Sequence, residues 1–114
     1  MHEFSIIENI FNTITEVAGK EKLNRVTRIN LVIGKMRQIV PDIFEYAFHI
    51  SSKNTIAENA KLSIEYVPIK MKCYDCNHIS EITDHIYFCS SCGSTNLELL
   101  SGKELYIKSI EFDC

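Results

Sequence analysis

This 114-residue sequence lacks a long hydrophobic run, a run of like charges and a glycine-rich loop. No apolar stretch approaches the ~20 residues that a membrane-spanning helix requires. The first residues interleave acidic and polar side chains with apolar ones, unlike the continuous apolar region of a secretory signal. We therefore expect a cytoplasmic protein without a membrane segment, in which the five cysteines stay reduced.

The charged residues are balanced and dispersed along the chain. There are 12 Lys and Arg against 15 Asp and Glu, a net charge of -3. No segment carries the five or six like charges that mark a nucleic-acid arm or a solvated tail. Electrostatic capture of nucleic acid or of an anionic membrane is therefore not expected.

The motifs of hydrolytic and nucleotide-dependent enzymes are also missing. None of the four glycines belongs to a phosphate-binding loop, and neither a His-Glu-x-x-His motif nor paired carboxylates occur. We expect the protein not to be an enzyme. Because no nucleotide site is recognisable, any energy input must come from a partner.

Apolar periodicity predicts two helices and three strands. Apolar residues three or four apart predict a helix over residues 4–18, with Gly19 as its C-terminal stop. Pro41 suits the first turn of a second helix, which should end near Ser52. Alternating apolar and polar residues predict strands over residues 25–33, 62–66 and 104–112.

The order of these elements predicts the fold class. Two strands joined through a helix favour a parallel pair, and a third strand that returns later makes the sheet mixed. We expect an α+β fold, with a small mixed three-stranded sheet, two helices on one face and an inserted zinc-ribbon-like module. The α/β domain would comprise residues 1–69 and 104–114, and the module residues 70–103.

Two Cys-x-x-Cys knuckles give the strongest signal in the sequence. Twelve residues separate them, so two turns can face each other across one tetrahedral ion, and four thiolates select zinc or, less readily, iron. Asn77 and Gly93 follow the knuckles and tolerate the left-handed backbone of such turns. We predict a closed, structural zinc site, whose binding free energy helps to fold the module, formed by Cys73, Cys76, Cys89 and Cys92.

Other potential ligands carry weaker signals. His78 lies two residues after Cys76, and it is a candidate substitute ligand or hydrogen-bond donor to a thiolate, although a surface loop histidine is the simpler explanation. His85 and His49 show no ligand pattern. Cys114 has no partner in the cysteine pattern and is expected to be a free thiol.

The N-terminal sequence Met1-His2-Glu3 offers a second metal site if the chain end is free. The α-amine of Met1, the backbone nitrogen and ring of His2, and the backbone nitrogen of Glu3 can form a plane of four nitrogens. Square-planar nitrogen donors suit Ni(II) and Cu(II), and binding displaces protons, so rising pH favours it. From the residues alone, a charge favourable to the first helical turn also explains Glu3.

Together these motifs resemble the HypA/HybF family of hydrogenase maturation nickel chaperones. The resemblance covers Met1-His2-Glu3 before an amphipathic helix, a strand that ends at Leu31-Val32-Ile33-Gly34, and the two knuckles. It implies that His2 is the essential nickel ligand, with Met1 and Glu3 as companions, and that Glu3 also matters for nickel transfer or docking. It further implies one structural zinc on the four cysteines.

The resemblance also implies partners and a function. Family members act with a GTPase accessory protein to load nickel into the large subunit precursor of nickel-iron hydrogenase and, in some bacteria, into urease. Some relatives place a histidine after each knuckle, whereas here only His78 does so and Gly93 precedes a serine. The resemblance therefore does not imply zinc-linked nickel or pH sensing that requires two such histidines, and a monomer and a homodimer both remain open.

A different class of protein also uses paired knuckles, namely zinc ribbons that bind nucleic acid or transcription complexes. Such a module should present a basic face with exposed aromatic residues. The charges between Lys70 and Lys103 are mixed, and the aromatic residues there are not set among arginines. The sequence therefore favours the nickel chaperone over this alternative.

Overall fold

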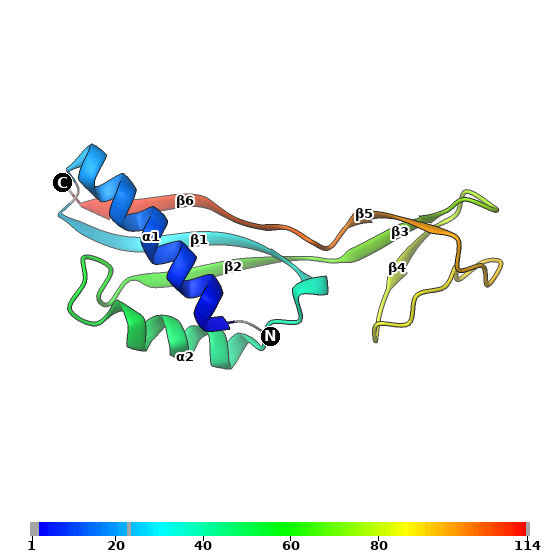
Figure 1. Ribbon diagram of the computed structural model, residues 1–114, viewed down its shortest axis with the longest axis horizontal. Helices are drawn as coiled ribbons and strands as arrows, with labels where there is room; N and C mark the ends of the chain where they lie inside the picture. Colours follow the sequence, from blue (N-terminus) through cyan, green and yellow to red (C-terminus); the bar gives the residue numbers. More distant parts are fainter. Residues whose placement is uncertain (1–2, 23, 114) are drawn as a thin grey trace. The chain divides into compact units, whose positions relative to one another are not determined.

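The computed structural model describes residues 3–22 and 24–113, which form two helices, one short 3-10 helix and six strands (Figure 1). The helices are α1 (Glu3–Glu21), η1 (Lys35–Arg37) and α2 (Pro41–Ser52). The strands are β1 (Arg25–Gly34), β2 (Lys61–Val67), β3 (Ile69–Cys73), β4 (Ile79–Ile82), β5 (Leu97–Ser101) and β6 (Leu105–Asp113). No helix in the described part of the chain is long and apolar enough to cross a membrane.

The strands form two sheets of three strands each. The first has the order β2-β1-β6 and the second the order β4-β3-β5. Figure 1 shows β1 and β2 running in the same direction and β6 running alongside β1 in the opposite direction. The predicted α+β fold with a mixed three-stranded sheet is therefore confirmed, and its elements lie within a few residues of the predicted ranges.

The chain divides into two compact units. The first contains residues 1–31, 38–64 and 107–114, and the second contains residues 32–37 and 65–106. The first unit includes both long helices, and the second includes all of β3, β4 and β5. Each unit has buried apolar side chains of its own.

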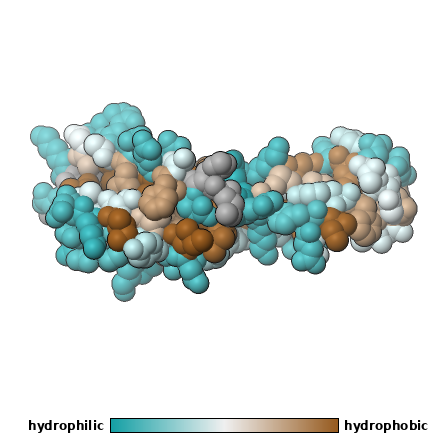
Figure 2. Space-filling model, turned by 60° about the horizontal axis from the view of Figure 1, so that its bottom comes forward, coloured by the Kyte–Doolittle hydropathy of each residue, from teal (hydrophilic) through white to brown (hydrophobic). Residues whose placement is uncertain are grey.

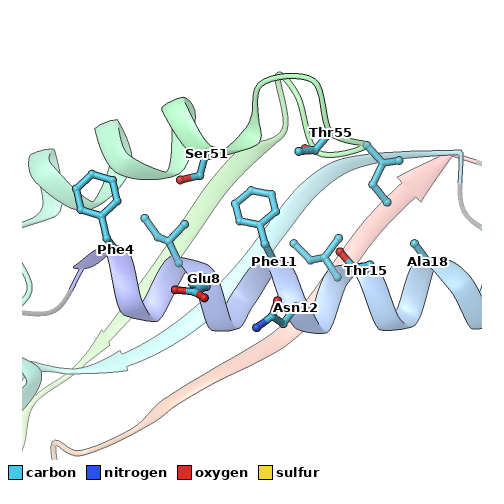
Figure 3. A pocket seen from close by; sticks show the side chains of 11 residues that line it. Phe4, Glu8, Phe11, Asn12, Thr15, Ala18, Ser51 and Thr55 are labelled. Atoms are coloured by element: carbon cyan, nitrogen blue, oxygen red, sulfur yellow. The ribbon is translucent and has the colours of Figure 1, made fainter.

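The core of the first unit forms where α1 and α2 pack on one face of the first sheet. Figure 3 shows α1 crossing in front of the strands with α2 alongside it, and the rings of Phe11 and Phe48 stack with their centroids 5.5 Å apart. The opposite face is polar, since Arg28 donates a hydrogen bond to Ser63 and Asn30 donates one to Ser109 at 2.9 Å. The fully or nearly fully buried residues include Ile7, Ile10, Ile14, Val26, Ile29, Leu31, Phe44, Ala47 and Phe48.

The helix α1 does not stop at Gly19 as the sequence predicted. It continues to Glu21, and Lys22 then adopts the left-handed conformation with φ of 55°. A glycine inside a helix costs only about 1 kcal/mol relative to alanine, and the packed helix on either side of it outweighs that penalty. The left-handed residue ends the helix because it turns the backbone out of the helical path.

The second unit contains three short strands that the sequence reading missed. Strand β3 pairs antiparallel with β4, with Ile69 opposite Ile82, and with β5, with Cys73 opposite Leu97. Buried Ile69, Met71 and Ile82 pack with Met36, Leu97 and Leu99. Each strand has only four or five residues, which is too short for a clear alternating pattern.

Gly34, at the end of β1, approaches the backbone of Gly102 too closely for a side chain. A Cβ atom on Gly34 would lie 1.9 Å from the Gly102 carbonyl oxygen. The Gly34 N–H also donates a hydrogen bond of 2.7 Å to the carbonyl of Glu104. Only glycine fits this position without a shift of the backbone.

Candidate metal centres

The two cysteine knuckles share one backbone arrangement. The N–H of Asn77 donates to the Cys73 carbonyl at 2.8 Å, and the N–H of Gly93 donates to the Cys89 carbonyl at 2.9 Å. The N–H groups of Cys73 and Cys89 in turn donate to the carbonyls five residues later, at 2.9 and 2.8 Å. Asn77 and Gly93 have positive φ, as predicted for turns of this kind.

This arrangement brings the four cysteine sulfurs together. All four Sγ atoms lie within 4.8 Å of one another, with Cys73 to Cys92 and Cys76 to Cys89 both at 3.6 Å. A tetrahedron with zinc–sulfur bonds of about 2.3 Å has edges of about 3.8 Å. The sulfurs are therefore spaced as ligands of one tetrahedral ion, and the predicted cysteine cluster is confirmed.

Polar side chains connect the two knuckles. The Ser80 hydroxyl, which is 3% exposed, lies 3.1 Å from the Ser90 hydroxyl and accepts a hydrogen bond from the Ser90 N–H at 3.1 Å. On the first knuckle, the Asp75 carboxylate accepts hydrogen bonds from Ser94 and from Asn96. These contacts tie the second knuckle to β4 and the residues that follow it to the first knuckle. The sequence reading missed all five residues, because Ser, Asp and Asn in loops are too common to indicate such pairing.

The thiols of the second knuckle have opposite pKa shifts. The N–H groups of Cys92 and Ser91 stabilise the Cys89 thiolate and lower its pKa to about 6. The Ser94 N–H lowers the pKa of Cys92, but hydrogen bonding with the other cysteines and loss of hydration outweigh it and raise that pKa to about 12. The closely spaced sulfurs therefore differ in how tightly they hold a proton. A cation that replaces the protons stabilises all four thiolates together.

Among the described residues, the group that can hold a metal contains the four cysteines and no histidine. His78 is exposed, and its carbonyl closes the first knuckle by accepting from Cys73. Its backbone N–H also bonds to the Cys76 sulfur and lowers the pKa of that thiol, although desolvation and the neighbouring thiols leave the pKa raised overall. His85 is exposed and lies 3.3 Å from the Tyr87 hydroxyl, whereas Cys114 lies outside the described residues.

The predicted nickel ligands Met1 and His2 also lie outside the described residues. Glu3, the first residue described, begins α1 and is only 8% exposed. Its carboxylate accepts a hydrogen bond of 3.3 Å from the N–H of Val40, immediately before α2. Sequence reasoning treated Glu3 as a favourable charge in the first turn of its own helix and missed this contact with another helix.

The first unit also carries an open groove of about 580 Å³ between α1 and the end of α2 (Figure 3). Phe4 and Phe11 point from α1 toward α2 across it, and Ser51 and Thr55 line the opposite wall. The remaining lining residues from α1 include Glu8, Asn12 and Thr15. The groove is mainly apolar and holds no cluster of metal-ligating side chains among the described residues.

Comparison with known proteins gives a consistent family. Residues 1–112 match the family model described as HypA, hydrogenase/urease nickel incorporation, metallochaperone. A hydrogenase maturation factor HypA of Aquifex aeolicus is 34% identical over 113 residues, covering 99% of this chain and 98% of the relative. The corresponding factor of Dehalococcoides mccartyi strain CBDB1 is 39% identical over 113 residues, covering 99% and 95%.

Solved structures show the same fold. A solution structure of a HypA protein superimposes with a TM-score of 0.69 at 25% identity, covering 98% of this chain and 96% of the other. The solution structure of the Ni metallochaperone HypA from Helicobacter pylori gives a TM-score of 0.65 at 24% identity, covering 98% and 97%.

The family model and the full-length relatives bear out the resemblance seen in the sequence, and they favour it over a nucleic-acid-binding zinc ribbon. They also agree with the expectation that the protein is not an enzyme, because the matched family consists of metallochaperones. The chain belongs to the HypA family of metallochaperones for hydrogenase and urease nickel incorporation.

Proposed function

We propose that this chain binds Ni(II) at its N-terminus and delivers it for maturation of nickel-iron hydrogenase. The observation that carries the proposal is the sequence Met1-His2-Glu3 at the start of a chain that matches the nickel incorporation family from residue 1. The donors would be the amine of Met1, the backbone nitrogen and ring of His2, and the backbone nitrogen of Glu3. The nickel would then be carried by the α/β domain of residues 1–69 and 104–114.

The chemistry of these donors suits a carrier. Four nitrogens in a plane favour Ni(II), and the amine, with an ordinary pKa of about 7.7–8.0, must lose its proton on binding. Protonation or a competing site can therefore dismantle the plane one donor at a time. Such a site binds near neutral pH and still releases its ion to a receiving protein.

The four-cysteine site would hold a structural zinc. Its sulfur spacing fits a tetrahedral ion, and four protein ligands leave no position for water or substrate. Zinc would therefore hold the two knuckles together and stabilise the module of residues 70–103, without taking part in a reaction.

Delivery requires contact with other proteins. We propose a GTPase accessory protein and the hydrogenase large subunit precursor as partners, in the cytoplasm, with urease as a further recipient in some bacteria. Exposed apolar side chains on α2 support a protein-binding role for the first unit, since Ile43 is 47% exposed and Tyr46 is 65% exposed. Figure 2 shows hydrophobic patches on the face that carries this helix.

A nickel titration tests the proposed site. Ni(II) is added to zinc-loaded protein with a native N-terminus, and the visible band of square-planar nickel is followed. His2→Ala and a variant with one residue added before Met1 should lose the planar site, whereas His49→Ala, which removes an exposed histidine from α2, should keep it. Equal binding by all four proteins, or binding by none, would show that the N-terminal assignment is wrong.

A further inference from the structure

Glu3 is the only charged side chain that is buried among the residues described. It is 8% exposed, and the other buried polar residues are both serines. A buried carboxylate is unfavourable unless it is hydrogen-bonded or paired. The Val40 N–H supplies such a hydrogen bond to its Oε2 atom at 3.3 Å, from a residue 37 positions along the chain.

The partner of Glu3 lies at the beginning of α2. Val40 is the N-cap of that helix, with an extended backbone of φ -86° and ψ 113°, and no side-chain cap hydrogen bond occurs there. Pro41 has no N–H, and the first N–H groups of a helix carry a partial positive charge. The Glu3 carboxylate therefore places its negative charge where a capping side chain ordinarily acts, but it comes from α1.

We propose that the Glu3 carboxylate is a positioning residue for nickel, which fixes the start of α1 to the N-terminus of α2 through Val40. This inference rests on the proposed N-terminal nickel site, because Glu3 contributes its backbone nitrogen to that site. A residue whose side chain is fixed presents its backbone nitrogen in fewer orientations, so less conformational entropy is lost when nickel binds.

The same contact separates a positioning role from direct coordination by the carboxylate. To bind nickel, the carboxylate would have to leave the Val40 N–H and a largely buried position. Carboxylate oxygen is also a harder donor than the nitrogens that favour planar Ni(II). We therefore infer that the Glu3 carboxylate stays bound to the Val40 N–H at the start of α2, while the backbone nitrogen of Glu3 binds the metal.

Two substitutions at one position test the hydrogen bond without altering any nickel donor. Val40→Pro removes the N–H and is compatible with the extended backbone that precedes Pro41. Val40→Ala keeps the N–H and removes most of the side chain. Nickel affinity is measured by competition with a chelator on zinc-loaded protein. Val40→Pro should bind nickel about tenfold more weakly than Val40→Ala, with the planar band unchanged in position.

A second pair tests the contact from its other end and does not depend on the proline variant folding. Glu3→Ala should weaken nickel binding by a similar factor of about ten, and Glu3→Gln, which keeps an acceptor oxygen, should lose less. Glu8→Ala removes an exposed carboxylate from the same helix and should bind like the wild type. Amide hydrogen exchange should show that Val40 loses protection in Glu3→Ala, and circular dichroism checks the fold of each variant.

The outcomes separate this inference from the nickel site itself. If Glu3→Ala shifts the planar band while Val40→Pro binds like Val40→Ala, the carboxylate is a ligand and the positioning role is wrong. If Glu3→Ala binds nickel with wild-type affinity, the contact has no effect on the site and the inference is also wrong. If the wild type forms no planar site, or His2→Ala keeps one, the proposed N-terminal site fails, and the positioning role fails with it.

Discussion

Asn77 and Gly93 occupy equivalent positions in the two knuckles, with φ of 63° and 77°. Each donates its N–H to the carbonyl of the first cysteine of its knuckle. In both turns the left-handed residue comes directly after the second cysteine. The chain reverses there, and the two cysteine sulfurs of each knuckle join the four-cysteine cluster. The backbone geometry of the zinc site therefore depends on these two residues as well as on the cysteines.

Substitutions at Gly93 should lower stability through backbone strain alone. A Cβ atom at this position meets nothing within 4 Å, so Gly93→Ala introduces no clash. The left-handed conformation costs a residue with a Cβ atom about 1–2 kcal/mol. Thermal unfolding of zinc-loaded protein should show this loss, and Asn77→Gly should be neutral or stabilising.

Gly19→Ala is the matched control for this prediction. Gly19 lies inside α1, has open space around it and is not among the residues with positive φ. Alanine should therefore stabilise the protein by up to about 1 kcal/mol. A result in which both glycine substitutions change stability in the same direction would contradict the assigned role of the left-handed backbone.

Zinc binding should depend on pH through the thiols of the second knuckle. In the zinc-free protein the pKa of Cys89 is lowered to about 6, so its thiolate predominates at pH 7. The pKa of Cys92 is raised to about 12, so its proton is still bound at pH 7 and zinc must displace it. Zinc affinity should therefore rise with pH above 7, and it should fall more steeply below pH 6, where Cys89 also binds a proton.

Calorimetry in buffers of different ionisation enthalpy measures this proton release directly. Zinc added at pH 7 should release fewer than one proton per cysteine from the four-cysteine site, because Cys89 has already lost its proton. A Cys89→Ser variant should lose zinc affinity and also lose the steepening below pH 6. If the number of protons released on zinc binding does not change near pH 6, the lowered pKa of Cys89 is wrong.

Gly34→Ala should be strongly destabilising, unlike Gly19→Ala. The new Cβ atom would lie 1.9 Å from the Gly102 oxygen and 2.6 Å from the Lys103 nitrogen, both of which are backbone atoms. Backbone cannot swing aside as a flexible side chain can, so the strand pairing must shift, at about 3 kcal/mol or more. Urea unfolding measures the difference, and wild-type stability in Gly34→Ala would show that the approach to Gly102 is not tight.

Local sequence patterns were sufficient for the helices, the first sheet and the zinc ligands. Apolar spacing identified α1 and α2 because burial on one helix face repeats every three or four residues. The knuckle spacing identified the four cysteines, because the geometry of a Cys-x-x-Cys turn is set within a few residues. The end of α1 was wrong, because the penalty for Gly19 is smaller than the packing that extends the helix to Glu21.

The remaining features depend on residues that are distant in sequence. The bond from Val40 to Glu3 joins residues 37 positions apart, and the approach of Gly34 to Gly102 joins two strand ends. No local propensity encodes such contacts, since they arise only when separate elements pack together. By itself the sequence determined the four-cysteine cluster and the main elements. Only the tertiary structure decided which carboxylate caps α2, because that choice follows from the distance between helices that the chain alone does not reveal.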